Sequence, residues 1–313
     1  MPSPVFSKKV IEQFGYDVNQ YRDDTGEIGI DILPEKGLVV GIRLQGVSLL
    51  DGICSKEDFE HNTHYKSSIL APFPNRLKYG KFTYRDKTYQ FPNNDTNFNH
   101  AIHGIHTESG FELIKEEAGS SLNLSMQYSY KGDKDYFPFP YTIKFDISLD
   151  SYKCQLGFEI QNTGVADAPL GIGWHPYFTL GQSLDECELC IPKCKKVELD
   201  AEMIPTGKLA VYKEYTKCKP IKEVHFDSMF LIEKDTDFTS LILENKTHKL
   251  RYYQETKPNK FNYLQIYSPG DRKSIAFEPM SCNIDAHNNL KGLQILAPNK
   301  KFRARCGVAL QRK

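Results

Sequence analysis

The sequence predicts an all-β protein, a large antiparallel β-sandwich, on three observations. Apolar and polar residues alternate with a period of two along most of the chain, as in residues 121–130 (SLNLSMQYSY) and 141–149 (YTIKFDISL). This is the pattern of a strand with one buried face. Turn signals separate such segments at intervals of about ten residues. Segments with a helical period are scarce, and aromatic residues, which favour strands, make up 12% of the chain.

Each expected strand follows from this alternation. Residues 81–91 (KFTYRDKTYQF) predict a hairpin in which the polar residues 85–87 form the turn. The segment 153–160 alternates in the same way and is joined to 141–149 by a turn at Asp150 and Ser151. Later strands are expected at 240–243, 249–253, 263–267, 274–277 and 303–310. One short helix is expected at 55–61, where Ser55 is a favourable N-cap.

Nothing in the sequence divides the chain into separate units. Its 313 residues contain no linker rich in Gly, Pro or Ser, no clear repeat and no low-complexity tract. All-β domains often exceed about 200 residues. One β domain spanning residues 1–313 is therefore the expected organisation.

The composition excludes several classes of partner. Lys and Arg number 40, Asp and Glu also number 40, and the formal net charge is +0. No overall field therefore attracts nucleic acid or a membrane surface. We find no signal peptide and no apolar run long enough to cross a bilayer. The eight cysteines are expected to be mostly reduced thiols of a cytoplasmic protein, although an even number also permits disulfides.

Two residues are candidates for proton transfer. His175 lies in the aromatic segment 174–178 (WHPYF), and Glu278 lies between Phe277 and Pro279. We expect Glu278 to end a buried strand, because Pro279 cannot donate to the ladder and biases the preceding residue toward an extended backbone. A histidine and a fixed carboxylate can together act as general acid and general base. The alternative for His175 is a core histidine with satisfied ring nitrogens.

Four further residues are candidates for binding hydroxyl groups. Asn75 and Arg76 follow a Pro-Phe-Pro segment that fixes the backbone, and they offer an amide and a planar donor fork. His103 precedes the flexible Gly104, and Asp227 stands between aromatic residues, where a carboxylate needs a partner. For Arg76 the structural alternative is a surface loop in which the arginine is salt-bridged. For Asp227 it is a carboxylate paired with an arginine or with backbone N–H groups.

Two clusters have some features of metal sites but lack a full ligand set. Segment 100–106 (HAIHGIH) spaces its histidines three apart, yet no carboxylate or cysteine accompanies them in a familiar pattern. We expect His103 to reach a ligand and the other two to be exposed. Cys187 and Cys190 have no second Cys-x-x-Cys, and Cys218 stands alone. No metal is expected, and a zinc-dependent enzyme is kept as an alternative.

Taken in order, these segments resemble the aldose 1-epimerase (galactose mutarotase) family. The resemblance runs from about residue 30 to the end of the chain. The motifs that carry it are 72–77 (PFPNRL) with 80–82 (GKF), 102–104 (IHG), 175–178 (HPYF), 226–227 (FD), and 277–279 (FEP) with 286–288 (AHN). The chain departs from the family at Ile105, where a second glycine often stands. The resemblance implies a large β-sandwich, the supersandwich, in agreement with the strand pattern.

The resemblance implies an isomerase that interconverts the α and β anomers of a free aldohexose of the galactose or glucose type, without a cofactor. Glu278 is then the general base and His175 the general acid. The residues that bind sugar hydroxyls are then Asn75, Arg76, His103 and Asp227. His175 has to be protonated near neutral pH, which requires a nearby anion because its ordinary pKa is about 6.5. We expect His175 and Glu278 to lie a sugar ring apart, without bonding to each other.

Two alternatives share this fold. One is a carbohydrate-binding protein without turnover, and the other is a hexose-6-phosphate mutarotase. A phosphate needs additional cations near the rim of the site, for which Lys78 and Lys81 are candidates. In each case the expected partner is a small sugar, and the protein is expected to be a monomer or a homodimer.

Overall fold

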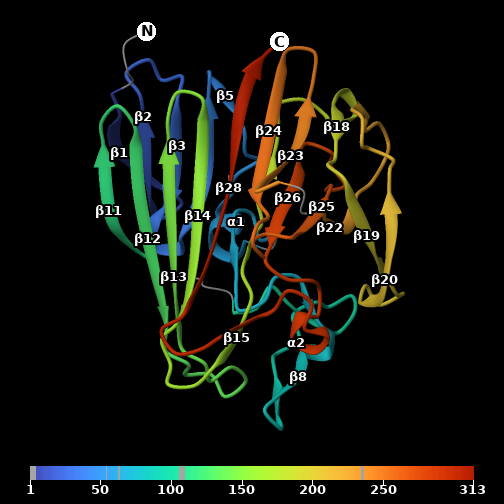
Figure 1. Ribbon diagram of the computed structural model, residues 1–313. Helices are drawn as coiled ribbons and strands as arrows, with labels where there is room; N and C mark the ends of the chain where they lie inside the picture. Colours follow the sequence, from blue (N-terminus) through green and yellow to red (C-terminus); the bar gives the residue numbers. More distant parts are fainter. Residues whose placement is uncertain (1–4, 54, 63, 106–109, 234–235) are drawn as a thin grey trace.

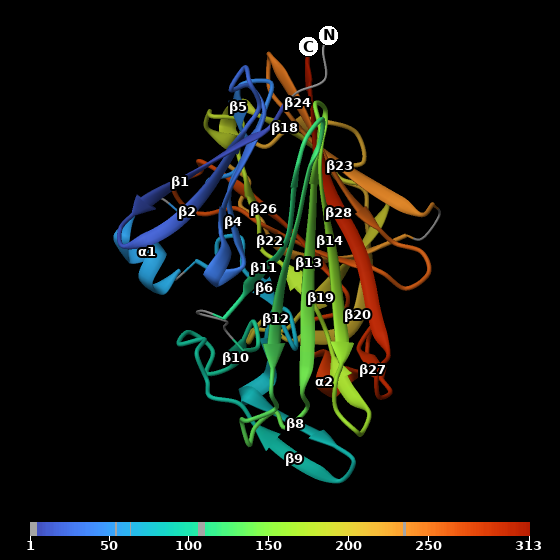
Figure 2. The same ribbon diagram turned by 90° about the vertical axis from the view of Figure 1, so that its left-hand side faces the viewer.

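The structure, a computed structural model, describes residues 5–53, 55–62, 64–105, 110–233 and 236–313. Within these ranges, three large antiparallel sheets of nine, eight and five strands make up most of the molecule (Figures 1 and 2). The expected all-β antiparallel architecture is therefore confirmed. None of the helices in the described ranges has the length and apolar character needed to cross a bilayer.

The nine-stranded sheet contains the strands with the clearest alternation. Its order is β11 (Glu112–Ala118), β12 (Leu122–Tyr130), β13 (Tyr141–Leu149), β14 (Lys153–Asn162), β28 (Lys301–Arg312), β24 (His248–Glu255), β23 (Phe238–Glu244), β18 (Glu188–Cys190) and β21 (Lys219–Pro220). In β13 every second residue is buried. This agrees with the period-two pattern from which the strand was predicted.

The eight-stranded sheet contains strands that are buried along their whole length. Its order is β20 (Pro205–Tyr212), β19 (Cys194–Leu199), β22 (Asp227–Ile232), β25 (Tyr263–Tyr267), β26 (Ile275–Met280), β16 (Gly173–Trp174) and β6 (Ile69–Leu70), while β17 (Tyr177–Phe178) also pairs with β26. All six residues of β26 are buried. A carboxylate in this strand is therefore held by packing on both sides.

The remaining elements surround these two sheets. The five-stranded sheet contains β1 (Ser7–Gln13), β2 (Tyr16–Arg22), β3 (Gly29–Leu33), β4 (Leu38–Leu44) and β5 (Val47–Ser48). The two-stranded pairs are β7 (Arg76–Leu77) with β10 (Ala101–Ile102), β8 (Lys81–Tyr84) with β9 (Lys87–Gln90), and β15 (Ala168–Leu170) with β27 (Gln294–Leu296). The helices are α1 (Lys56–His61) and α2 (Ala286–Asn289), with 3₁₀ turns at η1 (Pro34–Lys36), η2 (Lys78–Gly80) and η3 (Leu184–Glu186). The β8–β9 hairpin projects from the lower end of the molecule in both views (Figures 1 and 2).

Several local predictions are confirmed by these elements. The hairpin predicted at 81–91 is β8 and β9, with Arg85 and Asp86 at its turn. The helix predicted at 55–61 is α1, and the side chain of Ser55 accepts a hydrogen bond from the backbone N–H of Asp58 at its N-terminus. The later strands lie where the alternation placed them, with ends that differ by a few residues.

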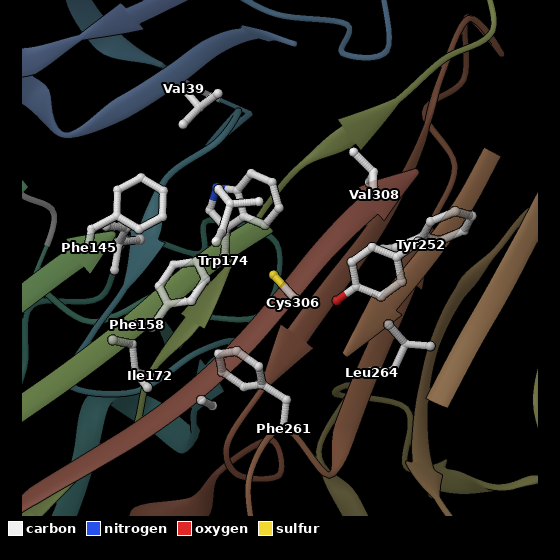
Figure 3. Packing of buried hydrophobic residues seen from close by; sticks show 14 of the residues in the cluster. Val39, Phe145, Phe158, Ile172, Trp174, Tyr252, Phe261, Leu264, Cys306 and Val308 are labelled. Atoms are coloured by element: carbon white, nitrogen blue, oxygen red, sulfur yellow. The ribbon is translucent and has the colours of Figure 1, made fainter. Parts of the chain in front are cut away.

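The core lies between the nine-stranded and eight-stranded sheets (Figure 3). Phe158 of β14 packs against Trp174 of β16 with ring centroids 6.1 Å apart, and Tyr252 of β24 packs against Phe277 of β26 at 5.8 Å. Because side chains alternate along a strand, a core-facing Phe277 turns its neighbour Glu278 to the opposite face of the sheet. The core thus determines which way the candidate base points.

The expectation that Glu278 ends its strand is wrong. β26 continues to Met280, and Pro279 lies opposite Leu264 of β25. On its other side β26 is flanked by β16 and β17, which are interrupted between Trp174 and Tyr177. A proline is tolerated at such a gap, because no continuous ladder needs its missing N–H. Glu278 is consequently fixed within a buried strand.

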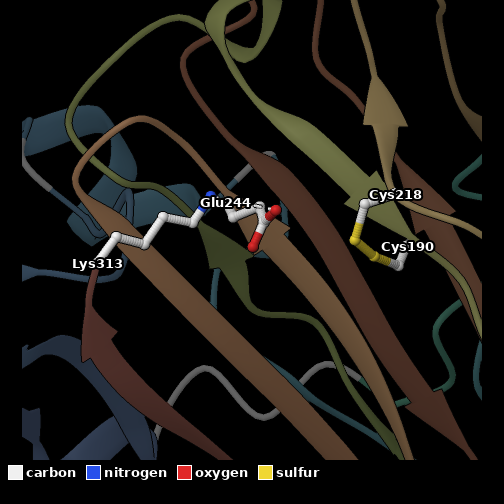
Figure 4. Close-up of a disulfide and its surroundings, with 4 residues drawn as sticks. All are labelled: Cys190, Cys218, Glu244 and Lys313. Carbon is white, nitrogen blue, oxygen red and sulfur yellow. Dashed lines mark ion pairs between the residues drawn. A yellow bond between two sulfur atoms is a disulfide. The ribbon is translucent and has the colours of Figure 1, made fainter.

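Cys190 and Cys218 form a disulfide across two paired strands (Figure 4). Leu189 of β18 lies opposite Lys219 of β21 in an antiparallel pair, so Cys190, which follows Leu189, meets Cys218, which precedes Lys219. The interpretation of Cys218 as an isolated cysteine is therefore wrong, and these two residues differ from the reduced thiols expected. The free cysteines among the described residues are Cys154, Cys187, Cys194, Cys282 and Cys306, all of them buried.

Candidate functional site

A cavity of about 420 Å³ lies beside the central strands of the eight-stranded sheet. All six residues predicted for the site line it: Asn75, Arg76, His103, His175, Asp227 and Glu278. They come from segments spread over more than two hundred residues of sequence. The cavity is the place where these segments meet.

Three neighbouring strands supply the floor of the cavity. Asp227 begins β22, Gln265 lies in β25, and Glu278 lies in β26 directly opposite Gln265. The amide Nε2 of Gln265 donates to Oδ1 of Asp227 at 2.6 Å. The carboxylate of Asp227 is thus held by a side chain from the adjacent strand, and Gln265 joins the two acids.

Asn75 and His103 fix each other on the opposite wall. Both have left-handed backbones, with φ of 58° and 65°. The N–H of His103 donates to the backbone oxygen of Asn75 at 2.9 Å, and the N–H of Asn75 donates to Nδ1 of His103 at 3.2 Å. An accepting Nδ1 places the proton of a neutral ring on Nε2. His103 therefore carries its N–H donor on the nitrogen away from the loop.

Arg76 is held by an acid that the sequence did not suggest. Its Nε donates to Oδ2 of Asp95 at 2.7 Å, and the two side chains are 12% and 7% exposed. Its guanidinium also lies over the ring of Phe98, 5.3 Å from the centroid. The structural alternative for Arg76, a salt-bridged arginine, is therefore half correct: the residue is ion-paired, yet it also lines the cavity.

The segment before and within α2 supports Arg76 from behind. The N–H of Asp285 donates to the backbone oxygen of Arg76 at 2.8 Å, and Oδ1 of Asp285 accepts from the N–H of Lys78 at 2.9 Å. His287 packs edge-on against Phe73, with ring centroids 5.6 Å apart. The motif at 286–288 thus belongs to the framework of the site and does not line the cavity.

His175 and Glu278 lie next to each other. Nε2 of His175 is 3.5 Å from Oε1 of Glu278, and their side chains are 7% and 2% exposed. The ring of Tyr177 stacks on that of His175, with centroids 4.9 Å apart and planes at 18°. The expectation that the pair lies a sugar ring apart is wrong. Both residues nevertheless face the same cavity, as a shared proton-transfer role requires.

Burial shifts the titration of this pair in opposite directions. The pKa of His175 is lowered to about 3, chiefly by desolvation, with a backbone hydrogen bond opposing the shift and the nearby His64 adding to it. Desolvation raises the pKa of Glu278 well above its ordinary value, and the charge of Asp227 acts in the same direction while Arg76 opposes it. His175 is therefore neutral near neutral pH, and burial favours the protonated, uncharged form of Glu278. This differs from the expected protonated His175.

Three buried polar atoms around the cavity have no partner among the described residues: Nδ1 of His175, Oε1 of Gln265 and Oε2 of Glu278. A buried polar atom without a hydrogen bond costs about 1–3 kcal/mol. Such atoms gathered at one cavity are suited to a ligand that offers both hydroxyl donors and oxygen acceptors.

The other histidine and lysine predictions have mixed outcomes. His100 is fully buried, its Nδ1 accepts from the N–H of Tyr79, and its Nε2 lies 3.1 Å from the backbone oxygen of Glu202. The expectation that His100 is exposed is therefore wrong, and His106 lies outside the described residues.

Lys78 pairs with Glu202 at 3.5 Å, and neither Lys78 nor Lys81 lines the cavity. Within the described ranges, no group of three or more His, Cys, Asp or Glu is arranged to hold a metal ion.

Sequence reasoning missed Asp95, Gln265 and Tyr177 as parts of the site. Asp95 and Gln265 are buried polar residues, 8% and 3% exposed. Tyr177 stands in the same motif as His175, and that proximity was the available signal. For Gln265 the signal was a polar side chain at the centre of the apolar strand 263–267 (YLQIY), where an unsatisfied amide is costly.

Gly104 controls the position of His103. Its φ is 77°, and a Cβ there would lie 2.3 Å from the backbone oxygen of Ala71. We expect Gly104→Ala to displace His103 and to lower the free energy of unfolding by about 1–3 kcal/mol, the range for overpacking. Urea unfolding measures this effect. Gly119→Ala, which meets nothing within 4 Å, is the control, and equal stability of the two variants would contradict the prediction.

Comparison with known proteins gives a consistent result. A sequence model of the aldose 1-epimerase family matches residues 37–309. The uncharacterized protein YihR of Escherichia coli is 29% identical over 254 residues, covering 78% of this chain and 79% of YihR. A galactose mutarotase-like protein of Clostridium acetobutylicum superposes with a TM-score of 0.86 at 22% identity, covering 99% of each chain. A galactose 1-epimerase of Lactobacillus acidophilus gives 0.80 at 15% identity, covering 99% of this chain and 98% of the other.

Proposed function

Because this chain belongs to the aldose 1-epimerase family, we propose that it interconverts the α and β anomers of a free aldohexose of the galactose or glucose type. The observation that carries the proposal is the buried pair of His175 and Glu278, 3.5 Å apart and facing one cavity. This reaction needs a general acid and a general base within hydrogen-bond reach of two oxygens that are bonded to the same substrate carbon.

The proposed chemistry opens and closes a hemiacetal. Glu278 takes the proton from the hydroxyl on C1 while His175 gives a proton to the ring oxygen. The bond between C1 and the ring oxygen breaks, C1 becomes an aldehyde carbon, and rotation about the C1–C2 bond turns its other face to the ring hydroxyl. Reclosure reverses both proton transfers, so acid and base are restored and no cofactor is consumed.

The short distance between the two groups suits this chemistry. The C1 hydroxyl and the ring oxygen are bonded to the same carbon, so the base and the acid have to converge on neighbouring atoms. A separation of a whole sugar ring would place one of them out of reach. Oε2 of Glu278 has no protein partner among the described residues and is the oxygen we assign to the C1 hydroxyl.

The proton distribution within the pair also fits. Burial favours the protonated form of Glu278 and the neutral form of His175, and transfer of a proton from Glu278 to His175 leaves the total charge of the pair unchanged. Substrate hydroxyls that bond to the carboxylate of Glu278 stabilise its ionised form. Binding of the sugar is thus expected to convert the pair into the working form, with Glu278 as base and His175 as acid.

Anomer exchange tests the proposal directly. Freshly dissolved α-D-glucose and α-D-galactose are followed by polarimetry or exchange NMR, with and without the protein. Equilibration much faster than in buffer is the expected result. Binding of either sugar by calorimetry without faster equilibration would instead identify a carbohydrate-binding protein that lacks turnover.

A further inference from the structure

We propose that Asp95 determines the specificity of this site: it neutralises the cavity's arginine and thereby reserves the cavity for uncharged aldoses. The inference rests on the proposed function and goes beyond it, since it assigns a role to a residue outside the acid–base pair. It begins from the ion pair between Asp95 and Arg76.

Asp95 is fixed by its own loop. Its N–H donates to the backbone oxygen of His100 at 2.9 Å, and its backbone oxygen accepts from the N–H of Asn99 at 2.9 Å. Its Oδ1 accepts from the N–H of Asn97 at 3.2 Å, which leaves Oδ2 for Arg76. The carboxylate is therefore placed in advance, and its contact with Arg76 is not a chance encounter of two mobile side chains.

Arg76 is positioned by this contact and by Phe98. The bond to Asp95 uses Nε of the guanidinium, and Phe98 lies against its face. The two Nη groups make no hydrogen bond to any described residue, and they offer donors to the cavity that Arg76 lines. A hydroxyl group can accept from them without a counter-ion.

The charges around the cavity are unfavourable for an anion. Of the described residues that line it, Asp95, Asp227 and Glu278 are acids, and Arg76 is the sole Lys or Arg. Even with Glu278 protonated, Arg76 faces the two remaining carboxylates. The pKa of Asp227 is raised, chiefly by burial and also by the charge of Asp95, while Arg76 and the hydrogen bond from Gln265 lower it. A phosphate or carboxylate that enters meets net negative charge, because the cavity's guanidinium is already paired.

An uncharged sugar meets no such penalty. Its hydroxyls can donate to the carboxylates of Asp227 and Glu278 and accept from the free N–H groups of Arg76. Charge-assisted hydrogen bonds of this kind are the stronger class of hydrogen bond in proteins. The same arrangement that repels an anion therefore favours a neutral polyol.

The test compares Asp95→Asn with the wild type on two probes, D-glucose and D-glucose 6-phosphate, by exchange NMR. Asparagine removes the charge and keeps one oxygen, which can accept from Nε of Arg76. Its amide nitrogen then stands where Oδ1 of Asp95 accepts from the N–H of Asn97. We expect the wild type to have a higher kcat/KM for glucose than for its 6-phosphate. In Asp95→Asn the ratio of the two kcat/KM values is expected to fall about tenfold or more, the effect of freeing one charged partner.

Two controls separate this role from a structural one. Asp167→Asn removes a carboxylate that pairs with Arg85 at 2.5 Å outside the cavity, and it should leave the ratio unchanged. Arg76→Gln added to Asp95→Asn should abolish the gain toward the phosphate, because the freed guanidinium is its cause. A gain that persists without Arg76 would overturn the proposal.

The outcomes also separate this inference from the proposed function. If the wild type exchanges neither sugar, the proposed function fails. If it exchanges glucose and Asp95→Asn leaves the ratio unchanged, the role of Asp95 fails alone. If Asp95→Asn does not fold, the wild type still decides. A preference for glucose 6-phosphate over glucose would overturn the role of Asp95. So would inhibition of glucose exchange by millimolar inorganic phosphate that exceeds the inhibition by NaCl at equal ionic strength.

Discussion

Replacing Glu278 by glutamine is expected to lower kcat for anomer exchange by about 10²–10⁴-fold, the usual contribution of a general base. Glutamine preserves the size of the side chain and its place in β26, but its amide cannot take the proton from the C1 hydroxyl. KM should change far less than kcat, because the hydroxyl contacts proposed for Arg76 and Asp227 are retained. A fall in kcat with little change in KM is the signature of an interaction used in the transition state.

Stability provides the control for this variant. Glu278 is 2% exposed and its pKa is raised by burial, so a neutral amide should not destabilise the fold through loss of a buried charge. Glu214→Gln changes an exposed glutamate that pairs with Lys219 at 3.2 Å, and it should retain full activity. Exchange by a folded Glu278→Gln variant at the wild-type rate would remove Glu278 from the mechanism.

The fold could be predicted from local pattern because long strands of the nine-stranded sheet, such as β13 and β14, have one buried face. β13 matches its predicted bounds of 141–149, and its burial alternates residue by residue. The eight-stranded sheet gives a weaker signal, since β26 is buried along its whole length and shows no alternation. The end of β26 was misplaced at Glu278 because a proline was expected to stop the ladder, whereas Pro279 lies at the gap between β16 and β17.

The site could be predicted as a set of residues and not as a geometry. The motifs identified the residues that line the cavity, yet the 3.5 Å distance between His175 and Glu278 follows from the pairing of β16 and β17, which flank His175 in the chain, with the same edge of β26. Register between distant strands is not visible in sequence. The same limit hid the disulfide of Cys190 and Cys218, which depends on the pairing of β18 with β21.

Buried polar partners were the second limit. Asp95 stands in the polar stretch 93–97 (NNDTN), which resembles an exposed loop. In the structure this loop turns back through hydrogen bonds between the N–H groups of Asn94 and Asp95 and the backbone oxygen of His100. Burial of His100 follows from the same turn, so one loop explains both the missed acid and the wrong expectation for the histidine.

Replacing His175 by glutamine is expected to lower kcat by about 10²–10⁴-fold, since the ring oxygen then loses its proton donor. His61→Gln, at an exposed position of the last turn of α1, is the matched control. The variant should also change the pH dependence of the residual activity. That change distinguishes loss of an acid from a general disturbance of the cavity.

The pH dependence follows from the single proton that the pair holds. The working form, ionised Glu278 with protonated His175, differs from the resting form only in where this proton lies. A second proton joins when the pH falls toward the lowered pKa of His175, about 3, and the base is then blocked. The first proton leaves when the pH rises through the raised pKa of Glu278, and the acid is then lost. Such limbs belong to the pair as a whole.

Wild-type kcat/KM is therefore expected to stay level through pH 6.5, where an ordinary histidine titrates, and to fall on either side of that plateau. In His175→Gln the base alone matters, so residual activity should rise with pH through the pKa of Glu278. His64, Asp227 and Tyr177 also face the pair and remain in both proteins, so they act as a common background. A wild-type acid limb centred near pH 6.5 would show that His175 titrates like a solvated histidine, and would contradict the proton assignment made from its burial.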